Sequence, residues 1–213
     1  MNYGEAKIDL AQGKWSISPQ LCALAGVVGP ILFLLVFTID GFLRPGYSPI
    51  YQMISDLGLG ANGWIQNANF VVFGLLLITF AIGFYQGMRP VISRRWLTAS
   101  TIFLVLVGAG LVNDGFFTKD VPGIHVLGFL VVFCSLITAF FIIGRQLWKN
   151  PAWRGYSWYS MITGIVTLGL LAAFIYVMDH AQAVGLFHRI LVIEAFGWYV
   201  VMGCRIIALK RPC

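Results

Sequence analysis

The sequence predicts an all-α protein, an integral membrane bundle of six transmembrane helices, and three observations predict it. Hydrophobic residues make up 59% of the 213 residues and charged residues only 10%, whereas a soluble domain typically carries about 25% charged residues. Six apolar runs each approach the roughly 20 residues that a helix needs to cross the hydrocarbon core. The basic residues gather in short loops between these runs, which is typical of membrane topology. Lipid is therefore the expected solvent.

The six expected spans account for most of the chain. Residues 1–18 are polar and are predicted to form a cytoplasmic N-terminal segment, and residues 210–213 a cytoplasmic tail. Residues 19–209 form one transmembrane domain, because no linker is long enough to divide it. The first run is too long for the apolar region of a cleavable signal peptide, so it is expected to remain as a span. The expected spans are residues 20–42, 64–86, 95–114, 123–146, 157–179 and 184–208.

The distribution of positive charge predicts that both termini lie in the cytoplasm. Eleven of the 14 basic residues lie on one side: before the first span, near or beyond the end of the last, or in and beside the loops after the second and fourth spans. The other side carries only Arg44, Lys119 and Arg189. The positive-inside rule assigns the richer side to the cytoplasm, and an even number of spans requires both termini on that side. The net charge of +6 thus reflects orientation, and no nucleic acid partner is expected.

The loop between the first two spans is predicted to contain a short extracytoplasmic amphipathic helix. Ser48 and Pro49 fit the N-cap and the first position of a helix. Apolar residues then recur at helical spacing from Ile50 to Leu57. Gly58 fits a C-terminal stop. We expect this helix to lie on the outer surface or to pack over the bundle.

Ionisable residues are divided unevenly between the two sides of the membrane. Six of the eight acidic residues and all three histidines fall in the outer half or near the midplane. Such groups are costly within a bilayer and often mark a site, so we predict a polar pocket in the extracytoplasmic half. The catalytic candidates are Asp114, His125 and Glu194, and the candidates for ligand binding are Arg44, Asp56, Asn69 and Arg189.

A metal site is one open alternative for these residues. Zinc takes three or four ligands from His, Cys, Asp or Glu, and His125, His180 and His188 are the candidate ligands. No HxxxH or HExxH pattern occurs, so the spacing is not diagnostic. On this alternative the protein is a metal-dependent membrane hydrolase in which zinc activates water and an acid serves as general base.

The leading interpretation is binding or processing of a lipid or small amphiphile. Arginine forms bidentate pairs with phosphate, so Arg44 and Arg189 would contact an anionic group. A transporter would instead use Glu194 as a proton-coupled group. A structural protein would use the same residues only to join helices, with Asp40 and Arg44 as an i, i+4 ion pair and Asn69 bonding a neighbouring helix. The oligomeric state stays open.

Several segments carry a resemblance to a known family. Residues 44–48 read RPGYS, residues 54–58 read ISDLG, residues 63–74 read GWIQNANFVVFG, and NDGFF followed by TKD precedes His125. The pattern resembles a bacterial and archaeal membrane family known only as domain of unknown function 998, over about residues 20–208. The resemblance implies a compact multi-span bundle in a prokaryotic cytoplasmic (inner) membrane, and no activity. The family is more distantly similar to eukaryotic membrane proteins linked to lipid remodelling, which favours lipid as the ligand.

A second comparison is with the ceramidase-like membrane hydrolases, which place a Ser, an Asp and three His around zinc. The matching residue types occur here, but the paired histidines of that superfamily's last helix and its seventh span are missing. Those roles are therefore not carried over. The residues of matching type are Ser55, Asp114, His125, His180 and His188.

Overall fold

The computed structural model describes residues 18–180 and 183–209, so the predicted cytoplasmic tail and almost all of the predicted N-terminal segment lie outside the described residues. Within the described part the fold is all-α, without a strand, and six helices are long and apolar enough to cross a membrane. The predicted fold class is thereby confirmed. The elements are α1 Pro19–Leu43, η1 Ile54–Gly58, α2 Gly63–Met88, α3 Arg94–Phe116, α4 Pro122–Leu147, η2 Pro151–Trp153, α5 Arg154–Asp179 and α6 Val184–Ile207.

Each long helix begins and ends within three residues of an expected span, because a run of about 20 apolar residues must bond its backbone internally in lipid. Local chemistry fixes several of the ends. Ser18 Oγ accepts a hydrogen bond from Leu21 N–H at 3.2 Å, with Pro19 in the first turn of α1. Pro122 takes the same early position in α4.

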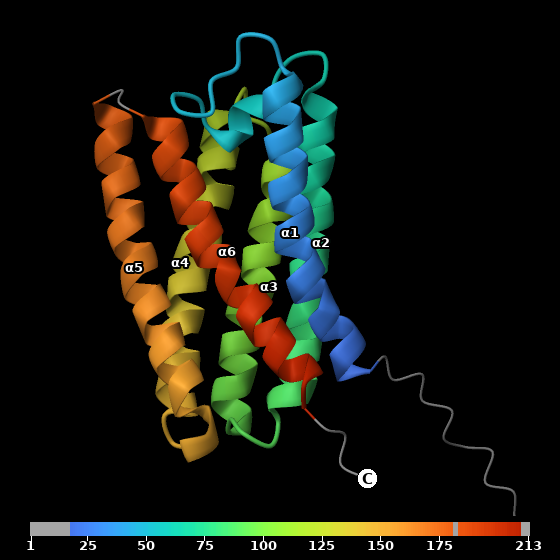
Figure 1. The fold of residues 1–213 in the computed structure, drawn as a ribbon, viewed down its shortest axis with the longest axis vertical. Coiled ribbons are helices and arrows are strands. Elements are labelled where there is room, and N and C mark those ends of the chain that lie inside the picture. Colours follow the sequence, from blue (N-terminus) through green and yellow to red (C-terminus); the bar gives the residue numbers. More distant parts are fainter. Residues whose placement is uncertain (1–17, 181–182, 210–213) are drawn as a thin grey trace, which may run out of the picture.

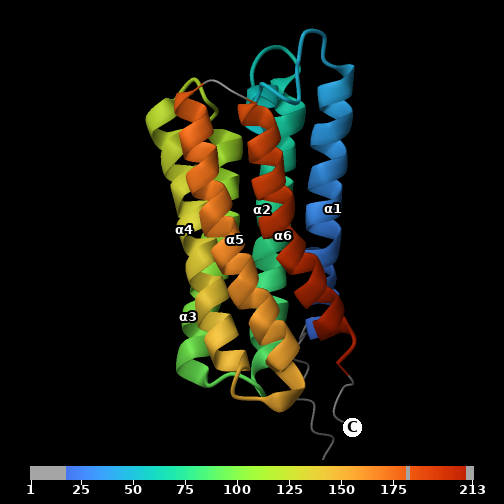
Figure 2. The ribbon, with the colours of Figure 1, turned by 60° about the vertical axis from the view of Figure 1, so that its left-hand side comes forward.

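The six helices form a closed ring in chain order (Figures 1 and 2). Each helix packs on the next, α6 returns to pack on α1, and α6 also touches α2 across the ring. The start of α1 and the end of α6 lie at the same end of the bundle. The loop with η1 covers the opposite end, where the N-terminus of α6 is also found.

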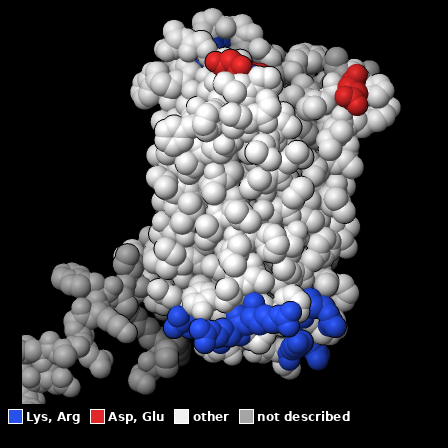
Figure 3. Space-filling model, turned by 180° about the vertical axis from the view of Figure 1, so that it is seen from behind, with Lys and Arg blue, Asp and Glu red and all other residues white. Residues whose placement is uncertain are grey.

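Charge separates the two ends of the bundle. On the face that Figure 3 shows, a band of lysine and arginine crosses the end where α2 and α4 finish, and acidic side chains lie near the other end. The lipid-facing surface between them is apolar, with exposed side chains such as Leu35, Leu75 and Ile165. This is the distribution from which the cytoplasmic placement of the termini is predicted. The protein is thus an integral, multi-pass membrane protein.

The loop after α1 differs from the predicted amphipathic helix. The prediction that a helix starts at Ser48 and Pro49 is wrong: a single turn closes with Gln52 N–H donating to Ser48 O at 2.9 Å, and the 3-10 helix η1 begins only at Ile54. Asp56 Oδ2 accepts from Met53 N–H at 2.7 Å and so caps η1. The element packs over the bundle, because Ile54 is completely buried.

Arg189 explains why the turn does not continue as a helix. Its Nη1 donates hydrogen bonds to Pro49 O at 2.7 Å and to Gln52 O at 2.9 Å. In a continuous helix these two carbonyl groups would accept hydrogen bonds from the helix itself. Its Nη2 donates to Tyr47 Oη. The loop lies so close to α6 that a Cβ on Gly185 would stand 2.2 Å from Gln52 O. The turn is therefore held by α6, about 140 residues away in sequence.

Candidate functional site

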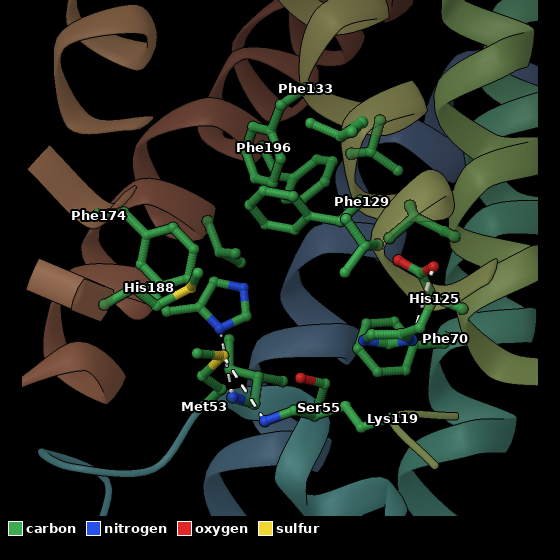
Figure 4. A pocket seen from close by; sticks show the side chains of 18 of the residues that line it. Met53, Ser55, Phe70, Lys119, His125, Phe129, Phe133, Phe174, His188 and Phe196 are labelled. Atoms are coloured by element: carbon green, nitrogen blue, oxygen red, sulfur yellow. Dashed lines mark hydrogen bonds and ion pairs between the residues drawn. The ribbon is translucent and has the colours of Figure 1, made fainter. Parts of the chain in front are cut away.

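A cavity of about 310 Å³ lies inside the bundle, directly beneath η1 (Figure 4). All six long helices contribute side chains to its lining, together with η1 and the loop between α3 and α4. Its volume is at the lower end of the roughly 300–1,000 Å³ that is usual for small-molecule pockets. The cavity is therefore large enough for one small ligand or one acyl chain.

The wall of the cavity is mostly aromatic. Phe129 of α4 contacts Phe133 on the same helix and Phe174 of α5, with ring centroids 4.7 and 5.6 Å apart. Phe133 and Phe196 lie at the end of the cavity opposite to Lys119 (Figure 4). The cavity thus has an apolar end deep in the bundle and a polar end near η1. The phenylalanines of this cavity wall are Phe33, Phe70, Phe129, Phe133, Phe174 and Phe196.

His188 of α6 is one of the buried polar groups that line the cavity. Its side chain is only 7% exposed, and its ring lies against Phe129 and Phe174. Ile54 N–H donates to His188 Nδ1 at 3.4 Å. An imidazole nitrogen that accepts a hydrogen bond carries no proton, so the proton of this neutral ring is on Nε2. His188 therefore joins η1 to α6 and presents a donor.

His125 and Asp114 lie where α3 ends and α4 begins. His125 Nδ1 is 2.9 Å from Phe117 O, and since a carbonyl only accepts, Nδ1 is the donor. The same nitrogen is 3.8 Å from Asp114 Oδ1. Asn113 Nδ2 donates to Ile124 O at 3.0 Å and to Asp114 Oδ1 at 3.4 Å. These contacts fix the loop between the two helices at the polar end of the cavity.

Gly128 permits the close approach of α4 to this carboxyl group. A Cβ at position 128 would lie 1.9 Å from Asp114 Oδ1 and 2.5 Å from Asn113 Nδ2. No side chain fits there without displacing Asp114. The glycine therefore determines how tightly the polar end of the cavity is built.

An ion pair connects the loop between α3 and α4 to η1. Lys119 Nζ lies 2.5 Å from Asp56 Oδ1, and Lys119 lines the cavity. The other oxygen of Asp56 caps Met53 N–H. Because the two opposite charges neutralise one another, the polar end of the cavity gains no net charge from this pair.

The cavity opens sideways between α4 and α5. Val126 and Leu130 of α4 and Ile175 and Met178 of α5 all line it, and all four side chains are also exposed on the outside of the bundle. The outside of the bundle at this depth is apolar and faces lipid. These four apolar side chains therefore form the border between the cavity and the lipid-facing surface.

Of the residues predicted for the site, the structure brings Asp114, His125 and His188 together around one cavity. Asp56 does not line the cavity, but it forms an ion pair with Lys119, which does. Glu194 lies elsewhere, half-buried between α5 and α6, where its Oε2 accepts from Thr167 Oγ1 at 2.7 Å.

The remaining predicted ligand-binding residues are occupied by contacts within the chain. Arg44 pairs with Asp40 at 3.2 Å, the i, i+4 pair weighed as its structural role, and donates to Leu59 O at 2.9 Å. Asn69 of α2 donates to Phe33 O of α1 at 3.2 Å. Neither the Arg44 nor the Asn69 side chain lines the cavity.

The three histidines do not form one cluster. His180 is exposed at the end of α5, where its ring stacks on Tyr176 with centroids 4.2 Å apart, and it does not line the cavity that His125 and His188 share. Across residues 18–180 and 183–209, no group of three or more His, Cys, Asp or Glu side chains has the arrangement of a metal site. The geometry thus lends no support to the zinc alternative.

The aromatic wall is the part of the site that the sequence interpretation missed. His125, Phe129 and Phe133 follow one another at i, i+4 spacing and so occupy one face of α4. That stripe was a usable signal, because it extends from a candidate polar residue into the span. It was obscured by the 17 phenylalanines of the chain.

Comparison with known proteins gives a family and nothing finer. A family model described as "Protein of unknown function (DUF998)" matches residues 27–205. The matched range includes every residue that lines the cavity. No curated protein and no solved structure matches the chain.

Proposed function

Since the chain belongs to the DUF998 family of membrane proteins of unknown function, we propose its function from the cavity: it binds a lipid or small amphiphile taken up from the bilayer. The observation that carries the proposal is a cavity of about 310 Å³ with an aromatic end, a polar end and a sideways opening. An amphiphile has the same division into an apolar body and a polar head.

Two features support this ligand class. Ligand pockets are typically apolar with a few converging polar groups, and here the polar groups are confined to the end near η1. The opening between α4 and α5 is bordered by Val126, Leu130, Ile175 and Met178, which are all apolar. A water-soluble solute would have no polar route through that border.

We further propose that the polar end of the cavity lies at the extracytoplasmic side of a prokaryotic cytoplasmic membrane. The support is the band of lysine and arginine at the opposite end of the bundle (Figure 3). On this orientation the ligand comes from the outer leaflet. The polar head then lies at interface depth, beside Lys119 and His125.

A photolabelling experiment tests the binding proposal. The protein is reconstituted in lipid nanodiscs with diazirine-bearing fatty alcohol and fatty acid probes, irradiated, and mapped by peptide mass spectrometry. We expect labels on the cavity-facing positions of α4 and α6, such as Phe129 and Val192. Labels confined to lipid-facing positions outside the cavity would contradict the proposal.

A matched pair of variants on α6 sharpens the test. Val192→Phe adds a ring inside the cavity, where Val192 is buried, whereas Val201→Phe adds the same ring at an exposed position outside it. The first variant should reduce cavity labelling by at least about tenfold, a loss of about 1.4 kcal/mol in binding. The second should leave it unchanged. Equal labelling of both variants would sink the proposal.

A further inference from the structure

The two histidines of the cavity present opposite hydrogen-bonding groups. Ile54 N–H donates to His188 Nδ1, so His188 Nε2 carries a proton and is a donor. His125 Nδ1 donates to Phe117 O, so Nε2 of the neutral His125 ring is an acceptor. Neither Nε2 atom has a hydrogen-bond partner within residues 18–180 and 183–209. One donor and one acceptor are therefore left for a ligand.

The charges at the polar end disfavour a charged head group. Lys119 is engaged by Asp56 at 2.5 Å, so an anionic head would have to displace a carboxylate that also caps Met53 N–H. A cationic head would approach the ammonium group of Lys119, which lines the cavity, while the carboxyl group of Asp114 at the same end already accepts a hydrogen bond from Asn113 Nδ2. Desolvation adds to both costs, because a charge loses most of its hydration in such a site.

We propose that the cavity selects an uncharged, hydroxyl-bearing amphiphile, such as a fatty alcohol or an acylglycerol. A hydroxyl group is both a donor and an acceptor. It can donate to His125 Nε2 or accept from His188 Nε2–H, while its chain lies against the phenylalanines at the apolar end. This inference rests on the proposed function and adds the chemistry of the head group.

Competition between four probes with the same chain length tests it. Dodecanol, dodecanoate, dodecyltrimethylammonium and dodecane are titrated against the photolabelling of the cavity in the wild-type protein. Dodecanol should displace the label at about tenfold lower concentration than each of the other three, a difference of about 1.4 kcal/mol, since it alone offers both a donor and an acceptor without a charge. This measurement needs no variant.

Two histidine variants locate the selectivity. His188→Phe keeps an aromatic ring against Phe129 and Phe174 but removes the Nε2–H donor. The advantage of dodecanol over dodecane should fall several-fold in this variant. His180→Phe makes the same change at an exposed position outside the cavity and should leave the advantage intact.

The outcomes separate the inference from the proposal on which it rests. If dodecanoate or dodecane displaces the label as well as dodecanol does, the head-group inference is wrong and amphiphile binding stands. If the cavity is never labelled, and no probe displaces anything from it, both are wrong. If dodecanol is preferred equally in wild type and His188→Phe, the histidines are not the source of the selectivity.

Discussion

Two aromatic clusters occupy the two ends of this bundle, and only one of them is hollow. The filled aromatic cluster lies in the second halves of α2, α4 and α6, towards the basic end, and consists of Phe80, Phe84, Phe140, Trp198 and Tyr199. Each of its side chains is 0% exposed, and the ring centroids around Trp198 are 5.0–6.2 Å apart. The phenylalanines of the cavity wall at the other end surround about 310 Å³ of empty space.

The difference between the clusters teaches that the cavity is not a consequence of too few large side chains. At the filled cluster, α6 contributes Trp198, whose Nε1–H donates a hydrogen bond to Ser160 Oγ at 2.9 Å. At the hollow end, α6 contributes the smaller Val192 and the polar His188. Protein interiors are normally close-packed, and a void forfeits dispersion energy. The bundle is close-packed at one end and contains the cavity at the other, so the cavity is specific to the end near η1.

The largest effect should come from truncating the filled cluster. Trp198→Ala removes a completely buried ring and leaves Ser160 Oγ without its partner, which should destabilise the fold by about 3–5 kcal/mol. Phe129→Ala only enlarges an existing cavity, so its cost should be much smaller. Thermal unfolding of both variants in one detergent measures the difference. Equal losses would show that the two clusters are packed alike and would break the comparison.

A smaller effect concerns the loop that covers the hollow end. Tyr47 Oη accepts from Arg189 and donates to Met53 O at 2.8 Å, which ties the turn before η1 to α6. Tyr47→Phe should cost about 1.5 kcal/mol in thermal unfolding at neutral pH. Tyr51→Phe changes an exposed tyrosine of the same loop and should cost almost nothing. A similar cost for both would mean that the tie to α6 is not what holds the loop.

The same hydroxyl predicts a pH dependence. Burial raises the pKa of Tyr47 above its usual value near 10, and Arg189 opposes part of that shift. The protonated phenol thus contributes stability that is complete below about pH 10 and is lost as the pH rises through the higher folded pKa. Between about pH 9 and about pH 11, wild type should therefore lose stability more steeply than Tyr47→Phe. Parallel curves would contradict the assignment.

Features that depend on neighbouring residues in the sequence could be predicted, whereas features that depend on contacts between distant residues could not. The six helices could be predicted because each is a continuous run of apolar residues, which is visible in the sequence without knowledge of any distant contact. The turn at Ser48 could not be predicted, because Arg189, far along the chain, takes the carbonyls that a helix would need. Propensity and spacing describe neighbours in sequence, whereas this contact joins two ends of the chain.

The candidate site divides in the same way. Sorting polar residues by side assigned Asp114, His125 and His188 to the same end of the bundle, and the structure brings them to one cavity. Arg44 and Asn69 were assigned to a ligand from their type alone, and the structure gives them Asp40 and Phe33 O as partners. The cavity itself depends on side chains from six helices, so no single run of residues predicts it.

The smallest effect should come from the ion pair that joins η1 to the loop between α3 and α4. Lys119 and Asp56 are both partly exposed, with side chains 31% and 21% accessible, so Lys119→Met should cost only about 0.5 kcal/mol. The cost should shrink at high salt, because ions screen such a pair. Lys149→Met removes a positive charge from the opposite, basic end of the bundle, where no ion pair is found within the described part of the chain, and serves as the control.

Hydrogen exchange of residues 53–59 should become faster only in Lys119→Met, because Lys119 binds η1 through Asp56, whereas Lys149 lies at the opposite end of the bundle. If the two variants exchange alike, the cover is held by Arg189 and His188 alone, and the ion pair contributes only to the electrostatics of the cavity.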